Sequence, residues 1–147
     1  MKKLFLLSVI IGLSVVFGFG QSASQGTIKG KLMYPSDYIP DTMIVCVQDY
    51  TKTFCSDSES EGFVFDLDYE NARYSIKLPA GKYYVFAAFP YGKAPTNDME
   101  GYEAYYNEFV TCGLSVDCTS RKKIEVTVKP NATVSEITPG DWYKPLD

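Results

Sequence analysis

Alternation of apolar and polar side chains with a period of two is the feature that most constrains the fold of this chain. In residues 26–34, GTIKGKLMY, the pattern places Ile28 and Leu32 on one face and Lys29 and Lys31 on the other. This spacing is typical of a half-buried β-strand. Similar runs predict further strands at residues 42–48, 53–55, 63–69, 74–78, 82–89, 122–129 and 131–139.

The stretch YSIKLPAGKYYVFA, residues 74–87, predicts two of these strands joined by a turn at Pro79-Ala80-Gly81. We expect them to form a hairpin, with Pro79 and Gly81 as its turn residues. The second strand is apolar on both faces, so we expect both faces to be covered, the outer one by the segment that follows.

About seven short strands, turn residues every 8–12 positions and no convincing amphipathic helix predict an all-β fold, an antiparallel β-sandwich. Residues 102–112 are compatible with either a strand or a turn or two of helix. We expect one sandwich domain over residues 26–147, preceded by a short polar leader at residues 21–25.

The first twenty residues have the pattern of a cleaved secretory signal peptide. Lys2 and Lys3 precede an apolar run, and Gly18 and Gly20 precede a predicted cleavage site before Gln21. The run is short for a membrane span, and no cysteine follows the cleavage site as a bacterial lipoprotein anchor would require. We therefore predict export to the periplasm or the extracellular space, with no stable membrane insertion after cleavage.

Four cysteines, all after the predicted signal peptide, indicate disulfide bonds in an exported chain. Three pairings are possible, and we prefer Cys46–Cys55 with Cys112–Cys118. If residues 50 and 51 form a turn, Cys46 lies opposite Cys55 on antiparallel strands at a separation that suits a disulfide. Cys112 and Cys118 bracket a short loop. Zinc is not indicated, because the chain has no histidine and no CxxC spacing.

Two motifs resemble those of the carboxypeptidase regulatory-like domains. The first is carried by Gly26, Ile28, Gly30, Leu32, Tyr34 and Pro35, and the second by Tyr74, Ile76, Leu78, Pro79, Gly81, Tyr83 and Val85. The resemblance implies an Ig-like or prealbumin-like sandwich and a non-catalytic module. In it, Pro79 would preset the turn, Gly81 would take a positive φ, and Tyr83 and Val85 would point into the core.

Charge and composition exclude several functions. Without residues 1–20 the chain has 12 basic and 18 acidic residues, so a nucleic-acid partner is not expected. The absence of histidine excludes Ser-His-Asp and Cys-His catalysis. Asp66 and Asp68 could serve a glycoside hydrolase, and the same acids could bind calcium, but a solvated strand face explains them better. No metal or cofactor is predicted.

Twelve tyrosines make aromatic side chains the remaining candidates for a ligand site. Tyr102, Tyr105, Tyr106 and Trp142 could stack on a sugar or anchor a partner protein, or they could cap the sandwich. We therefore predict a non-enzymatic, exported accessory or binding module that contacts an envelope or extracellular protein. The alternative is a carbohydrate-binding module that uses these aromatic side chains.

Overall fold

The computed structural model describes residues 24–144, which form ten β-strands, one single-turn α-helix and one 3₁₀ turn. The elements are β1 (Gln25–Lys31), β2 (Ile44–Gln48), β3 (Thr53–Cys55), β4 (Val64–Asp68), β5 (Arg73–Pro79), β6 (Gly81–Ala88), η1 (Asn97–Met99), β7 (Glu103–Tyr105), α1 (Glu108–Thr111), β8 (Val126–Val128), β9 (Thr133–Val134) and β10 (Asp141–Tyr143). The predicted signal peptide lies outside the described residues.

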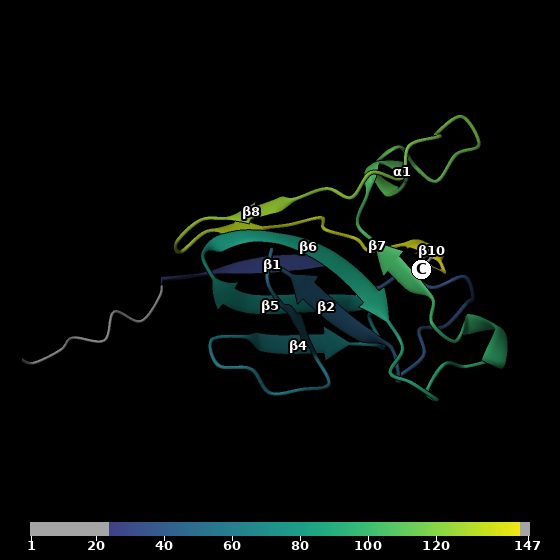
Figure 1. Cartoon of the computed structure of the whole chain (residues 1–147), viewed down its shortest axis with the longest axis horizontal. Coiled ribbons are helices and arrows are strands. Elements are labelled where there is room, and N and C mark those ends of the chain that lie inside the picture. Colours follow the sequence, from purple (N-terminus) through teal and green to yellow (C-terminus); the bar gives the residue numbers. More distant parts are fainter. Residues whose placement is uncertain (1–23, 145–147) are drawn as a thin grey trace, which may run out of the picture.

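Two sheets pack face to face, as predicted for an all-β chain (Figure 1). A four-stranded sheet has the order β4-β5-β1-β9. A six-stranded sheet has the order β10-β7-β6-β2-β3, with β8 paired to the first half of β6. All the pairs are antiparallel except β9, which runs parallel to β1, so the prediction of a wholly antiparallel sandwich is wrong at that edge.

The core lies between the sheets and consists of the apolar half of each alternating pattern. Ile28 and Ile76 from the four-stranded sheet and Val45 and Val85 from the six-stranded sheet have no exposed surface. Tyr83 is also buried, so the prediction that Tyr83 and Val85 point inward is confirmed. Burial of each such side chain contributes roughly 1.5–3 kcal/mol, which makes this layer the main source of stability.

The C-terminal segment lies against the inward-facing glycines of β1. A Cβ atom on Gly30 would lie 1.6 Å from the carbonyl oxygen of Ile137, and one on Gly26 would lie 2.6 Å from that of Lys129. The hydroxyl of Tyr74 donates to the same Ile137 carbonyl at 2.5 Å. The two glycines of the first motif therefore permit close backbone contact, a use of glycine that a side chain would block.

The prediction that residues 74–87 form a hairpin is wrong. β5 pairs with β1 and β4 in one sheet, whereas β6 pairs with β2, β7 and β8 in the other. Pro79-Ala80-Gly81 therefore carries the chain from one sheet to the other. Alternation and a turn are required equally for a hairpin and for such a crossing, so the sequence pattern did not distinguish them.

The predicted positive φ of Gly81 is also absent, since the positive-φ glycines of the described chain are at other positions. A Cβ atom at Gly81 would lie 3.1 Å from the hydroxyl oxygen of Tyr83. That hydroxyl donates to the carbonyl of Pro79 at 3.0 Å. Gly81 thus leaves space for the Tyr83 ring, whose hydroxyl group binds the residue at which the chain leaves the first sheet.

Three further segments differ from the sequence-based expectation. Residues 102–112 contain both alternatives, the strand β7 followed by the single turn α1. The predicted tail contains β10, which pairs with β7. Gln25, predicted as part of the polar leader, begins β1. β7 and β10 have three residues each and α1 has four, too few for a periodic pattern to appear in the sequence. β1 has seven residues and begins one residue earlier than predicted.

Candidate functional site

The aromatic side chains predicted as ligand residues lie on opposite sides of the six-stranded sheet. Tyr105 faces outward, where it stacks on Phe86 with ring centroids 4.9 Å apart and is 5% exposed. The ammonium of Lys123 lies 3.5 Å from the centre of the Tyr105 ring. Tyr106, the next residue along, packs instead against the main core.

Trp142 is half-buried and fixes β10 to the loop after β1. Its ring packs against Tyr34 and Phe89 at centroid distances of 5.5 and 5.2 Å, and its Nε1 donates to the carbonyl of Met33 at 2.8 Å. Tyr102 is half-buried as well. These four aromatic residues do not share one exposed plane, so their arrangement is that of packing residues and gives no support to a sugar platform.

The acidic pair predicted for a possible hydrolase lies on β4 with both side chains exposed. The backbone N–H of Asn71 donates to Asp68 Oδ1 at 3.0 Å and its amide to Oδ2 at 2.7 Å. These bonds, with smaller help from Arg73, lower the pKa of Asp68. A glycosidase needs one carboxyl group with a raised pKa, so the environment of Asp68 is the opposite of that of a general acid.

Both predicted disulfides are present. Cys46 and Cys55 lie directly opposite each other in the β2–β3 register, with Cα atoms 4.1 Å apart. The Cα atoms of Cys112 and Cys118 are 6.0 Å apart. Disulfides of this kind are characteristic of oxidising compartments outside the cytosol. No helix among residues 24–144 is long and apolar enough to cross a membrane.

The second disulfide closes an arm that extends away from the sandwich (Figure 1). We define the arm as residues 107–123, because an antiparallel bridge between Asn107 and Lys123 joins its two ends. It contains α1 and the Cys112–Cys118 loop. No residue of α1 is buried, so core packing does not hold the arm in position.

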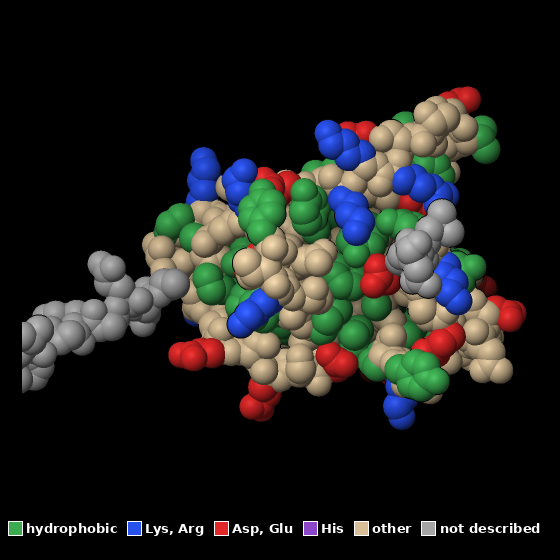
Figure 2. All heavy atoms as spheres, in the orientation of Figure 1, with side chains coloured by type: hydrophobic (Ala, Val, Ile, Leu, Met, Phe, Trp, Pro, Cys, Tyr) green, Lys and Arg blue, Asp and Glu red, His purple; other side chains and the backbone are tan. Residues whose placement is uncertain are grey.

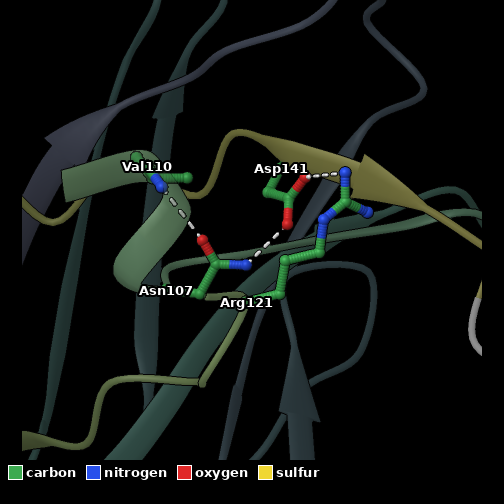
Figure 3. A network of polar contacts seen from close by, with 4 residues as sticks. All are labelled: Asn107, Val110, Arg121 and Asp141. Atoms are coloured by element: carbon green, nitrogen blue, oxygen red, sulfur yellow. Dashed lines mark hydrogen bonds and ion pairs between the residues drawn. The ribbon is translucent and has the colours of Figure 1, made fainter. Parts of the chain in front are cut away.

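A polar network at the base of the arm fixes its direction (Figure 3). Asn107 caps α1 by accepting from the N–H of Val110 at 3.0 Å, and its amide donates to Asp141 Oδ2 at 2.7 Å. Arg121 Nη2 lies 3.6 Å from Asp141 Oδ1. Asn107 is fully buried and Asp141 is 3% exposed, so this network connects the arm to β10 beneath the surface.

The same arginine covers the aromatic side chains around the base. Its guanidinium carbon lies 5.1 Å from the ring centre of Phe109 and 5.6 Å from that of Tyr143. Cation–π contacts at such distances contribute about 0.5–1 kcal/mol at exposed sites. Arg121 therefore links the arm to the sheet: it contacts Phe109 in the arm and Asp141 and Tyr143 in β10.

The tip of the arm exposes apolar side chains. Val116 is 96% exposed and Leu114 is 39% exposed, although the disulfide-closed loop around them is otherwise small and polar. Leu114 has a φ of 56° and follows Gly113, whose φ is 93°. A non-glycine residue held at positive φ costs on the order of 1 kcal/mol. Figure 2 shows green apolar side chains at the outer end of this projection.

The sequence predicts no function for the arm beyond its disulfide. Its base depends on Asn107 and Asp141, which are 34 residues apart and share no local pattern. The exposed tip could be predicted from the sequence, since Leu114 and Val116 are two apolar residues inside a seven-residue loop that cannot bury them. A loop of this size has no interior.

Comparisons with known proteins gave no match to a family model, a curated protein or a solved structure. The geometry of the arm and the sandwich is therefore the basis for the function proposed below.

Proposed function

We propose that the chain is an exported, non-catalytic binding module that docks on a protein partner through the tip of the arm. The observation that carries this proposal is Val116, whose side chain is 96% exposed on a covalently closed loop. A preorganised loop loses little conformational entropy on binding, so a small apolar tip can provide useful affinity. An apolar tip of this kind fits an apolar pocket on the partner.

The polar base supports the same proposal, because a docking loop must be held in one direction. The buried network of Asn107 and Asp141 and the covering Arg121 do this without a packed core inside the arm. Leu114 is held at positive φ, and its N–H donates to the carbonyl of Phe109 at 3.0 Å, so backbone hydrogen bonds also fix the start of the loop.

The assignment to an exported Ig-like or prealbumin-like module, related to the carboxypeptidase regulatory-like domains, is part of this proposal. It is supported by the two disulfides and by the packing roles of Gly26, Gly30 and Tyr83 in the two motifs. We expect the secreted protein to begin at Gln21. Amino-terminal sequencing of the exported protein tests this, and retention of residues 1–20 would contradict it.

Site-specific photo-crosslinking tests the docking surface. A photoreactive residue placed at Val116 should form a discrete adduct with one protein of an envelope or extracellular fraction. The same residue at Val64, which is 61% exposed on β4, serves as the matched control. Excess unlabelled wild-type protein should abolish the adduct, whereas excess Val116→Asp protein should leave it.

The purified partner then gives the quantitative result. Val116→Asp should weaken binding at least tenfold, because a charge cannot enter an apolar pocket without a large desolvation penalty. Val64→Asp should leave the affinity unchanged. Equal crosslinking from both positions, or equal affinity of both variants, would refute docking through the arm.

A further inference from the structure

The outer face of the four-stranded sheet contains a hollow of about 400 Å³. The arm follows β7, which belongs to the other sheet. β4, β5 and β1 lie side by side beneath the hollow (Figure 1). Most of the residues that line it are charged or polar, and its size falls within the range of small-molecule sites. The residues that matter for the argument are Lys29, Lys31, Arg73, Ser75, Asp66 and Glu136.

Three cations are neighbours on this face. In the strand register Lys31 is directly opposite Arg73, and Lys29 is opposite Ser75, the residue two positions along from Arg73. Like charges directly opposite each other destabilise a sheet. The three cations lie on β1 and β5, whereas the carboxylates of the hollow, Asp66, Asp68 and Glu136, lie on β4 and after β9.

These cations have no ion-pair partner within the described part of the chain, where the two ion pairs are Lys82–Glu125 and Arg121–Asp141. Asp68 lies opposite Arg73 in the register and attracts it, since Arg73 helps to lower the pKa of Asp68, but the two side chains do not form an ion pair. Lys29 and Lys31 therefore remain available to an external anion, with Arg73 beside them.

The rest of the hollow offers a different chemistry. Ser75 lies between Asp66 and Lys29 in the cross-strand row, and its short side chain leaves the space above the sheet open. The carboxylates of Asp66 and Glu136 lie at the two sides. The hollow thus combines donors for a carboxylate with acceptors for hydroxyl groups. A simple inorganic anion would not use these acceptors.

We propose that this hollow binds a saccharide that carries a carboxylate. The carboxylate would lie among Lys29, Lys31 and Arg73, and the hydroxyls of the sugar would donate to Asp66 and Glu136. This site differs from the predicted aromatic platform in both position and chemistry. It is also independent of the arm, so either proposal can fail without the other.

Isothermal titration calorimetry with three probes tests the proposal: trigalacturonate, a hyaluronan tetrasaccharide and sialyllactose. At least one should bind saturably at concentrations up to about 10 mM, and its neutral counterpart should not. Arg73→Gln and Lys31→Gln should each weaken that binding roughly tenfold, the value of one charge-assisted hydrogen bond. Lys52→Gln, in the turn before β3, is the control and should leave the affinity unchanged.

Folding of the variants is checked by urea unfolding. Lys31→Gln should unfold at the same or a slightly higher urea concentration, because it removes a like charge opposite Arg73. A variant with weaker binding and undiminished stability separates loss of a ligand contact from loss of structure.

Inorganic phosphate and acetate distinguish the saccharide from a small free oxyanion. If either binds as tightly as the best saccharide and Asp66→Asn has no effect, the saccharide proposal is overturned. It is also overturned if none of the three probes binds, or if binding survives unchanged in Arg73→Gln and Lys31→Gln.

Discussion

The sandwich and the arm are stabilised by different interactions, and the contrast explains what each can tolerate. In the sandwich, apolar side chains from two sheets bury one another, and residues such as Ile28, Ile76 and Val85 have no exposed surface. In the arm, α1 buries nothing, and one disulfide with a few polar contacts at the base holds the shape. The tip of the arm can therefore change in sequence at little cost to the fold.

The largest effect should come from the sandwich layer itself. Ile76→Ala removes a fully buried side chain and should lower the free energy of unfolding by about 3 kcal/mol, measured by urea denaturation. Val64→Ala, on the exposed side of β4, should change it by less than about 0.5 kcal/mol. Similar values for the two variants would contradict the assignment of the core.

The disulfide inside the sandwich should come next. Replacement of Cys46 and Cys55 by alanine opens a loop with a sequence separation of 9 and should destabilise the whole protein by about 2.5 kcal/mol. Cys46 is buried, and its partner lies directly opposite on β3, so the effect should appear in global unfolding. An unchanged urea midpoint in the double variant would count against this role.

The base of the arm should give an intermediate effect. Asn107→Ala removes the cap of α1 and leaves the buried carboxylate of Asp141 without its amide donor, which should cost about 1–2 kcal/mol. Asp141→Asn, the matched control, retains an acceptor and should cost less. Trypsin digestion should cleave Asn107→Ala sooner at Arg121 and Lys122 than wild type, and equal digestion rates would argue against an anchoring role.

Alkaline pH should destabilise the sandwich through its buried tyrosines, a residue type that the arm does not contain. Burial raises the pKa of Tyr74 and Tyr105 above the usual value of 10. The folded state keeps such hydroxyls neutral, so their stabilisation is complete below pH 10 and is lost as the pH rises above that value.

The loss for Tyr74 alone should be about 1.4 kcal/mol at pH 11 relative to pH 8, because pH 11 is one unit above the unfolded pKa of about 10 and each unit is worth about 1.4 kcal/mol for one titrating group. Urea unfolding at both pH values measures it. In Tyr74→Phe, this part of the pH dependence should disappear. A variant with the same pH dependence as wild type would show that other tyrosines account for the loss.

The smallest effect on the sandwich should come from the disulfide of the arm. Replacement of Cys112 and Cys118 by alanine should shift global unfolding by less than about 0.5 kcal/mol, although the loop is of similar size to the other one. Trypsin should cleave the arm faster in this variant. If the free energy of unfolding fell as much as in the Cys46–Cys55 variant, the arm would not be independent of the sandwich.

The sequence predicted those features that depend on near neighbours. The pairing of Cys46 with Cys55 followed from a short turn between two strands, and the buried faces of β1 and β5 followed from alternation. Alternation does not say which sheet a strand joins, so it predicts a hairpin at Pro79–Gly81, where the chain crosses between the sheets. The base of the arm and the contact of Gly30 with Ile137 join distant residues and left no local signal.

The position of β1 has a consequence for the order of folding. β1 is flanked by β5 on one side and by β9 on the other, so its hydrogen bonding is complete only after more than one hundred further residues have been made. Such distant strand pairing makes chain closure slow, typically milliseconds to seconds for a β-sandwich. A nascent chain that ends before residue 133 leaves one edge of β1 unpaired, and it should remain unfolded or bind chaperones until β9 has been made.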